Sequence, residues 1–122
     1  MNISIIDFDR YVTNAIDSIE PQFRQHLSQV PVIIEDTPDQ LVCQNLKLAD
    51  PRSLLGLFRG TPLNRRSVLS NVTTDQIILY RKNLLAFCTS QQQLQNQIRI
   101  TLIHELAHYL GFSEEQIRQL HY

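Results

Sequence analysis

The sequence has no long hydrophobic run, no excess of one charge and few cysteines. None of its apolar stretches approaches the about 20 residues that a helix needs to cross a bilayer, so a membrane-spanning protein is not expected. The opening residues MNISIIDFDRYV contain acids where a secretory signal needs a basic segment followed by continuous apolar residues. No secretory signal is therefore predicted.

The near-neutral charge removes the usual electrostatic reason to bind a polyanion. The formal net charge is −1 over 122 residues, so binding to nucleic acid or to an anionic membrane surface is not expected. Three arginines, Arg59, Arg65 and Arg66, lie close together in the sequence, and we expect them to be solvated surface.

The two cysteines, Cys43 and Cys88, are far apart and belong to no CxxC pattern. Without a signal sequence we expect both to be reduced and buried, which makes a cytoplasmic location the default. Apolar residues make up 43% of the chain and charged residues 19%, which is typical of a globular protein. A chain of this length predicts one domain over residues 1–122 and, by default, a monomer.

Hydrophobic periodicity predicts helices at both ends of the chain. Apolar side chains recur at helical spacing over 7–29, where Pro21 is expected to break the helix into two. A second helix is predicted over 91–110, with Thr89 or Ser90 in a capping box because each is followed three residues later by Gln. Ser113 is expected to start a short last helix.

Strands are predicted between these helices. The stretches expected to be strands are 30–36, 53–60 and 75–83, the last with Asn83 at a turn. Residues 37–51 are polar and flanked by prolines, which predicts a loop, and 84–88 suits either a strand or a helix. The pattern as a whole predicts an α+β domain with a small sheet.

The stretch TLIHELAHYLGFSE (101–114) contains the pattern HExxH, formed by His104, Glu105 and His108. Residues four apart project from one face of a helix, so the two imidazoles can meet one metal ion. Glu105 lies about 100° round the helix from His104, from where its carboxylate could accept a proton from a zinc-activated water. The alternative is that the two histidines are satisfied by hydrogen bonds within a polar seam.

The rest of this helix indicates what the motif faces. One strip about 100° wide holds the polar side chains Gln97, Thr101, His104, Glu105 and His108. Most of the remaining circumference is apolar, so we expect the helix to be buried and the strip to face a cavity, a cleft or a ligand. Arg99 falls within the apolar arc, and the pattern assigns it no role.

A catalytic zinc usually has three protein ligands, and Glu114 is the predicted third. Gly111 follows His108 by three residues and can turn the chain at the helix end, because glycine adopts the left-handed conformation without strain. Glu115, His121 or no protein ligand remain alternatives. Glu114 also suits the first turn of a helix for dipole reasons alone, and both roles can hold together.

The segments LLGLFRGTPLNRRS (54–67), DQIILYRKNLL (75–85) and IRITLIHELAHYLGFSEEQIRQL (98–120) resemble the small bacterial zincin-like metallopeptidase family. The resemblance implies an α+β zincin-like fold, in which a small mixed sheet packs on an N-terminal helix and a long HExxH helix. It also implies that His104 and His108 are metal ligands, that Glu105 is the general base and that Glu114 is the third ligand.

Two departures from better-known zincins stand out. The only methionine is Met1, so the Met-turn of metzincins is absent, and no large C-terminal subdomain follows the motif. In related zincins an edge strand pairs with the substrate backbone, and 76–81 or 54–59 could do so here by strand addition.

The resulting prediction is a zinc (Zn²⁺) peptidase that acts on a peptide or protein substrate. A non-catalytic metal-binding or protein-interaction module is the second hypothesis, and a metal-dependent nuclease is the third. Fe(II) is an alternative to zinc for a site with two histidines and one carboxylate. Tyr109 and Tyr122 could stabilise an oxyanion, although Tyr109 is expected to serve in packing and His26 to lie at the surface.

Overall fold

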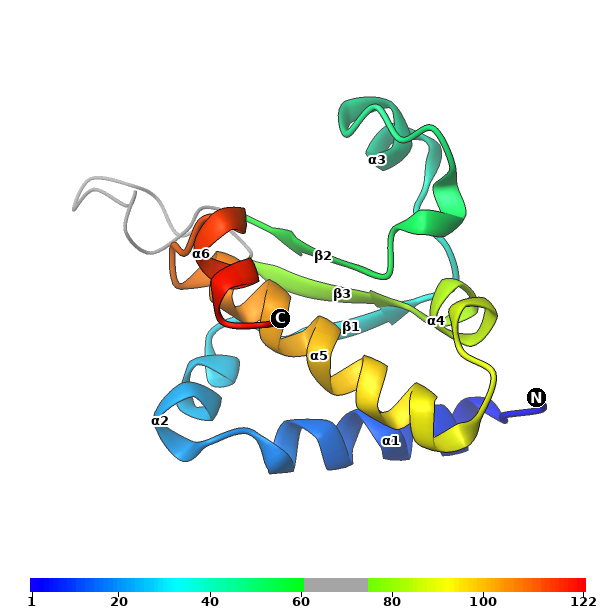
Figure 1. Cartoon of the computed structure of the whole chain (residues 1–122), viewed down its shortest axis with the longest axis horizontal. Coiled ribbons are helices and arrows are strands. Elements are labelled where there is room, and N and C mark those ends of the chain that lie inside the picture. Colours follow the sequence, from blue (N-terminus) through cyan, green and yellow to red (C-terminus); the bar gives the residue numbers. More distant parts are fainter. Residues whose placement is uncertain (61–74) are drawn as a thin grey trace.

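The computed structural model describes residues 1–60 and 75–122 and shows the predicted α+β architecture (Figure 1). The helices are α1 (Ile5–Ser18), α2 (Pro21–Arg24), α3 (Gln40–Asn45), α4 (Arg81–Phe87), α5 (Gln91–Tyr109) and α6 (Glu114–Gln119), with short 3-10 helices at Gln25–Ser28 and Pro51–Ser53. The strands are β1 (Val32–Glu35), β2 (Gly56–Arg59) and β3 (Gln76–Tyr80). None of the helices in the described ranges is long and apolar enough to cross a membrane.

The three strands form one mixed sheet in the order β1-β3-β2. β1 runs parallel to β3, and β2 runs antiparallel to it with Leu57 opposite Ile78. β3 is therefore paired on both sides, so the hypothesis that 76–81 binds a substrate strand is wrong. Of the two segments considered, only 54–59 contains an edge strand of the sheet that the described residues form.

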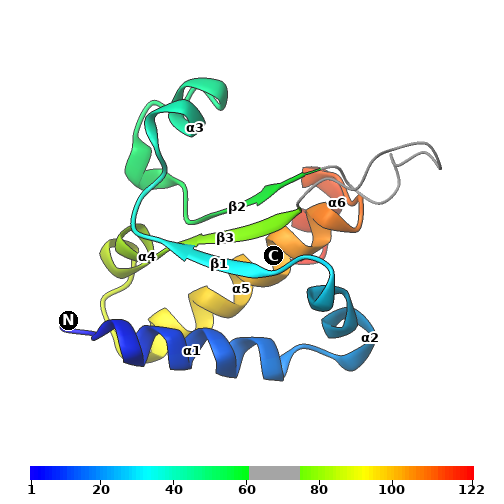
Figure 2. The ribbon, with the colours of Figure 1, turned by 180° about the vertical axis from the view of Figure 1, so that it is seen from behind.

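Helices α1 and α5 cover one face of this sheet (Figures 1 and 2). α5 contacts β2 and β3 directly, and α1 packs along α5. The buried core joins the apolar face of α1 to α5 and to alternate residues of β3; it includes Phe8, Val12, Ile77, Leu79, Leu94, Ile98 and Leu102. α3 lies on the side of the sheet away from α5 (Figure 2).

The N-terminal helical region breaks where the sequence predicts. α1 ends at Ser18, and Pro21 is the first residue of α2, a position where proline's missing N–H costs no helical hydrogen bond. His26 was expected at the surface but is half-buried, with its ring edge against Tyr109 at a centroid distance of 6.1 Å. Arg99, which had no predicted role, joins α5 to α1 by donating to Ser18 Oγ at 3.1 Å.

Two predictions about short elements are wrong. Residues 37–51 are not all loop, because Asp39 caps α3 by accepting the N–H of Val42 at 2.8 Å. Asn83 is not at a turn, because β3 leads directly into α4, which also includes most of 84–88. The Asn83 side chain is buried and donates to the carbonyl oxygens of Pro51 and Leu54 at 2.9 and 2.7 Å.

The caps of the last two helices follow the sequence signals. Ser90 caps α5 by accepting the N–H of Gln93, while the Gln93 side chain accepts the N–H of Thr89 rather than that of Ser90. Ser113 and Gln116 form the predicted reciprocal capping box of α6.

The remaining surface and cysteine predictions have mixed outcomes. Arg59 is exposed as expected, whereas Arg65 and Arg66 lie outside the described residues. Both cysteines are free; Cys88 is buried, but Cys43 is only half-buried because α3 stands at the surface.

Candidate metal centre

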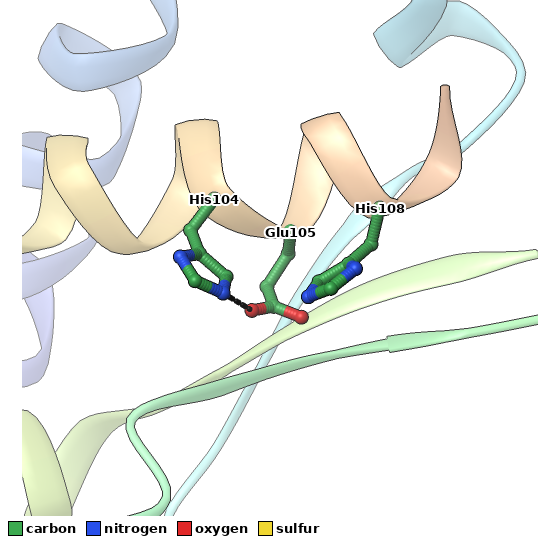
Figure 3. A group of neighbouring side chains, drawn as sticks. All are labelled: His104, Glu105 and His108. Carbon is green, nitrogen blue, oxygen red and sulfur yellow. Dashed lines mark ion pairs between the residues drawn. The ribbon is translucent and has the colours of Figure 1, made fainter. Parts of the chain in front are cut away.

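The two histidines of the motif lie one turn apart on α5 and project from the same side of the helix (Figure 3). Their ring centroids are 5.0 Å apart with an interplanar angle of 68°. Each side chain is partly open to solvent, His104 with 26% and His108 with 25% of its surface exposed. The rings are therefore neither sealed in the core nor pointing apart.

A glycine turn brings Glu114 back to these rings. α5 ends in a Schellman motif, in which Gly111 at φ 96° donates its N–H to His108 O and Phe112 donates to Ala107 O, both at 3.0 Å. The chain reverses there, and Glu114 becomes the first residue of α6. One oxygen, Glu114 Oε1, lies 3.2 Å from His104 Nε2 and 2.5 Å from His108 Nε2.

The other candidates for a third ligand lie elsewhere. Glu115 Oε2 pairs with Arg118 at 3.4 Å along α6, and its side chain is exposed. His121 is exposed at the end of the chain. Of the three residues considered, Glu114 alone makes hydrogen bonds with both imidazoles.

Glu105 is buried between α5 and β2. Its Oε1 accepts the main-chain N–H of Phe58 at 2.9 Å, and its Oε2 lies 4.0 Å from His104 Nε2 (Figure 3, dashed). Burial raises the pKa of Glu105 above its usual value, although the charges of His108 and His104 and the Phe58 amide oppose the rise. A carboxylate with a raised pKa is a stronger proton acceptor.

The pKa of Glu114 moves in the opposite direction. Partial burial acts to raise it, but the hydrogen bonds and charges of His104 and His108 together outweigh burial and hold the pKa of Glu114 below its usual value. The two carboxylates of the site thus differ in character, since Glu114 is held as an anion beside the rings and Glu105 is the more basic group.

A glycine allows β2 to lie close enough to α5 for the Phe58–Glu105 hydrogen bond. A Cβ added at Gly56 would meet Thr101 Cγ2 at 2.6 Å and Ile78 O at 3.1 Å. Sequence reasoning gave neither Gly56 nor Phe58 a role. A glycine inside a predicted strand is the signal that could have found this contact, because it often marks a close approach of backbone.

The motif opens onto a cleft of about 550 Å³ between β2, α5 and α6. Its described lining includes His104, Glu105, His108 and Glu114 together with Leu46, Leu54, Gly56, Leu57, Phe58 and Phe112. The polar strip of α5 continues away from the cleft into the interior, where Thr101 is buried and accepts a hydrogen bond from Gln97 at 3.1 Å.

Neither tyrosine considered for the oxyanion lies in this cleft. Tyr109 is buried, with its ring edge against Phe58 at a centroid distance of 5.7 Å, which confirms its predicted role in packing. Tyr122 lines a separate apolar groove beside Phe23 and Leu120. The oxyanion hypothesis for these two residues is therefore wrong.

The donor atoms suit a zinc ion. Neighbouring ligand atoms of a tetrahedral zinc are about 3.3 Å apart when each bond is about 2.0 Å, and the His104–Glu114 distance of 3.2 Å matches this separation. The 2.5 Å between His108 and Glu114 is a hydrogen-bond distance, so the carboxylate has to withdraw by about 1 Å to admit the ion. The ligand atoms of His104, Glu105 and His108 also lie within 4.8 Å of one another.

The model of the family described as zincin-like metallopeptidase matches residues 27–122, which is most of the chain. The chain belongs to this family. A search of the curated proteins found no match. Membership of the zincin-like metallopeptidases confirms the resemblance seen in the sequence and implies a metal ion, typically zinc, for which the His-Glu-His group is a possible site.

Proposed function

We propose that the protein is a zinc-dependent peptidase, in which His104, His108 and Glu114 hold the metal and Glu105 is the general base. The observation that carries the proposal is that the Glu114 carboxylate meets both imidazole Nε2 atoms at the wall of an open cleft. Three protein donors with an open side are the arrangement of a catalytic zinc, whereas a structural zinc is closed by four.

Zinc bound there would polarise the scissile carbonyl and lower the pKa of a water molecule toward about 7. Glu105 would accept the proton of the attacking water at Oε2, because Oε1 is engaged by the Phe58 amide. The same carboxylate would return the proton to the leaving amine. The Phe58 amide thus orients the base, so that one oxygen is fixed and the other faces the cleft.

The substrate would add as an extended strand to the edge of β2 that faces away from β3, where no other strand of the described residues pairs. Tyr80 donates its main-chain N–H to Leu55 O at 3.0 Å, so the alternation of an antiparallel pair directs the N–H and C=O of Gly56 and the C=O of Phe58 away from β3. The Phe58 N–H lies on the same edge but is already donated to Glu105. Strand addition uses main-chain groups at such an edge and needs no particular side chain. A peptide or protein is therefore the proposed substrate.

The test combines metal analysis with a cleavage assay on an unfolded protein. Wild type and Glu105→Gln are expected to hold about one zinc per chain, with cleavage only by wild type; His108→Ala should lose the metal. His121→Asn is the matched control for the histidine, because asparagine tolerates the left-handed backbone at that position, φ 68°. Equal cleavage by wild type and Glu105→Gln would reject Glu105 as the base.

A second pair of variants tests the third ligand. Glu114→Gln should weaken zinc binding, whereas Glu115→Gln, its neighbour on α6, should not. If wild type binds zinc but neither wild type nor any variant cleaves the unfolded protein, the non-catalytic interaction module would be favoured. The nuclease hypothesis has less support, since no lysine or arginine is among the described residues that line the cleft and the net charge is −1.

A further inference from the structure

The cleft has an apolar wall that the proposed chemistry does not use. Three leucines form it, Leu46 at the end of α3, Leu54 just before β2 and Leu57 within β2; we call them the leucine wall. Leu46 keeps 46% of its surface exposed although it lines a cleft. Large apolar side chains that gather at a concave site typically mark a binding surface.

Leu57 of the leucine wall lies on the side of β2 opposite the metal centre. A Cβ at Gly56 would point at Thr101 and Glu105 of α5, so the next residue, Leu57, faces away from α5. Leu46 is the C-cap of α3, and α3 also lies on the side of the sheet away from α5 (Figure 2).

We propose that the leucine wall makes the peptidase select extended segments with a large apolar side chain next to the bond that is cleaved. The proposal rests on the proposed function, because it takes the substrate to be a strand added to β2. Side chains of such a strand alternate between the two faces. When one residue faces the metal centre, its neighbours face the leucine wall.

The charges at the cleft point to the same substrate. Its only described acids are Glu105 and Glu114, and no described lysine or arginine lines it, so an acidic side chain that faces the leucine wall would find no cationic side chain among the described residues. A volume of about 550 Å³ also exceeds what the reacting bond alone would fill. Burial of one leucine-sized side chain is expected to favour it over aspartate by roughly tenfold or more.

The test measures binding of labelled peptides that differ at one position, Leu or Asp, to the zinc-loaded Glu105→Gln protein by fluorescence anisotropy. We expect the Leu peptide to bind at least about tenfold more tightly. Adding Leu46→Lys should reduce that preference and make the Asp peptide bind more tightly than before. A gain of binding by one peptide cannot arise from unfolding.

Leu41→Lys is the matched control, because Leu41 is also on α3 and is 64% exposed but does not line the cleft. It should leave both affinities unchanged. Equal binding of the two peptides, no binding of either, or the same effect from Leu41→Lys as from Leu46→Lys would overturn the inference.

Cleavage of the same peptides by wild type separates this inference from the proposed function. Cleavage of both at equal rates would support the peptidase and overturn the leucine wall as a selective surface. The expected binding preference without any cleavage would support the wall as a peptide-binding surface and count against the peptidase.

Discussion

Replacement of Gly56 by alanine should push β2 away from α5. The added Cβ would lie 2.6 Å from Thr101 Cγ2, 3.1 Å from Ile78 O and 3.4 Å from Glu105 Cγ. Overpacking of this kind costs about 1–3 kcal/mol, while the stiffer unfolded chain returns about 0.4–1 kcal/mol. A net loss of about 1–2 kcal/mol in the free energy of unfolding is expected.

The same contact can be relieved by a second substitution. Thr101→Ser removes Cγ2, the closest atom, and keeps the hydroxyl that accepts a hydrogen bond from Gln97. Gly56→Ala should therefore cost at least about 1 kcal/mol less in the Thr101→Ser background, as contacting residues couple by about this much. The residual cost reflects Ile78 O, a main-chain atom that yields less readily.

Urea denaturation of the four proteins in this double-mutant cycle measures the coupling, provided that the m-values agree. Because the displaced strand carries the Phe58 amide, Gly56→Ala should also reduce cleavage more than it reduces zinc binding. An equal cost of Gly56→Ala in both backgrounds would refute the account of why glycine stands at this position.

Three further changes test other parts of the structure. The Tyr80 hydroxyl is buried without a hydrogen-bond partner among the described residues, so Tyr80→Phe should raise the free energy of unfolding by about 1 kcal/mol in thermal or urea melts; a loss of stability would contradict this. Burial, and after it the charge of Glu35, raises the pKa of Tyr80 from 10.0 to about 12. The unfolded chain therefore loses the Tyr80 proton at lower pH than the folded chain, so the free energy of unfolding of wild type should fall between these two pH values. Tyr80→Phe should lack this contribution to the pH dependence. Asn83→Ala removes the donor to the carbonyl oxygens of Pro51 and Leu54 and should lower the free energy of unfolding by about 2–3 kcal/mol in urea denaturation. A loss below about 0.5 kcal/mol would show that these two hydrogen bonds contribute little. Ser113→Ala removes the cap of α6, so it should lower the free energy of unfolding by about 1 kcal/mol and weaken zinc binding in calorimetry. Ser4→Ala, the equivalent change in α1, should leave the zinc affinity unchanged.

The sequence predicted the elements whose signals are local and long. α5 shows helical periodicity over many residues, and its end is marked by Gly111, whose left-handed conformation the structure confirms. Ser113 and Gln116 lie three positions apart and satisfy each other, so the start of α6 could be read from spacing alone.

Short elements and long-range contacts could not be predicted in the same way. α3 has six residues, too few for periodicity to emerge from a polar stretch, and α4 follows β3 with no glycine or proline between them. The strand order depends on pairings between distant segments, which no local pattern encodes. The Phe58–Glu105 hydrogen bond joins positions 47 apart in the chain.

The separation of these contacts along the chain has a consequence for how the centre assembles. The first and last of the three proposed ligands are only ten positions apart, so closing that loop costs little entropy. α5, the glycine turn and α6 suffice to gather them. The proposed base needs β2, which comes from a distant part of the chain. Loosening of the sheet edge would thus leave a protein that still captures metal but has lost the group that fixes its proton acceptor.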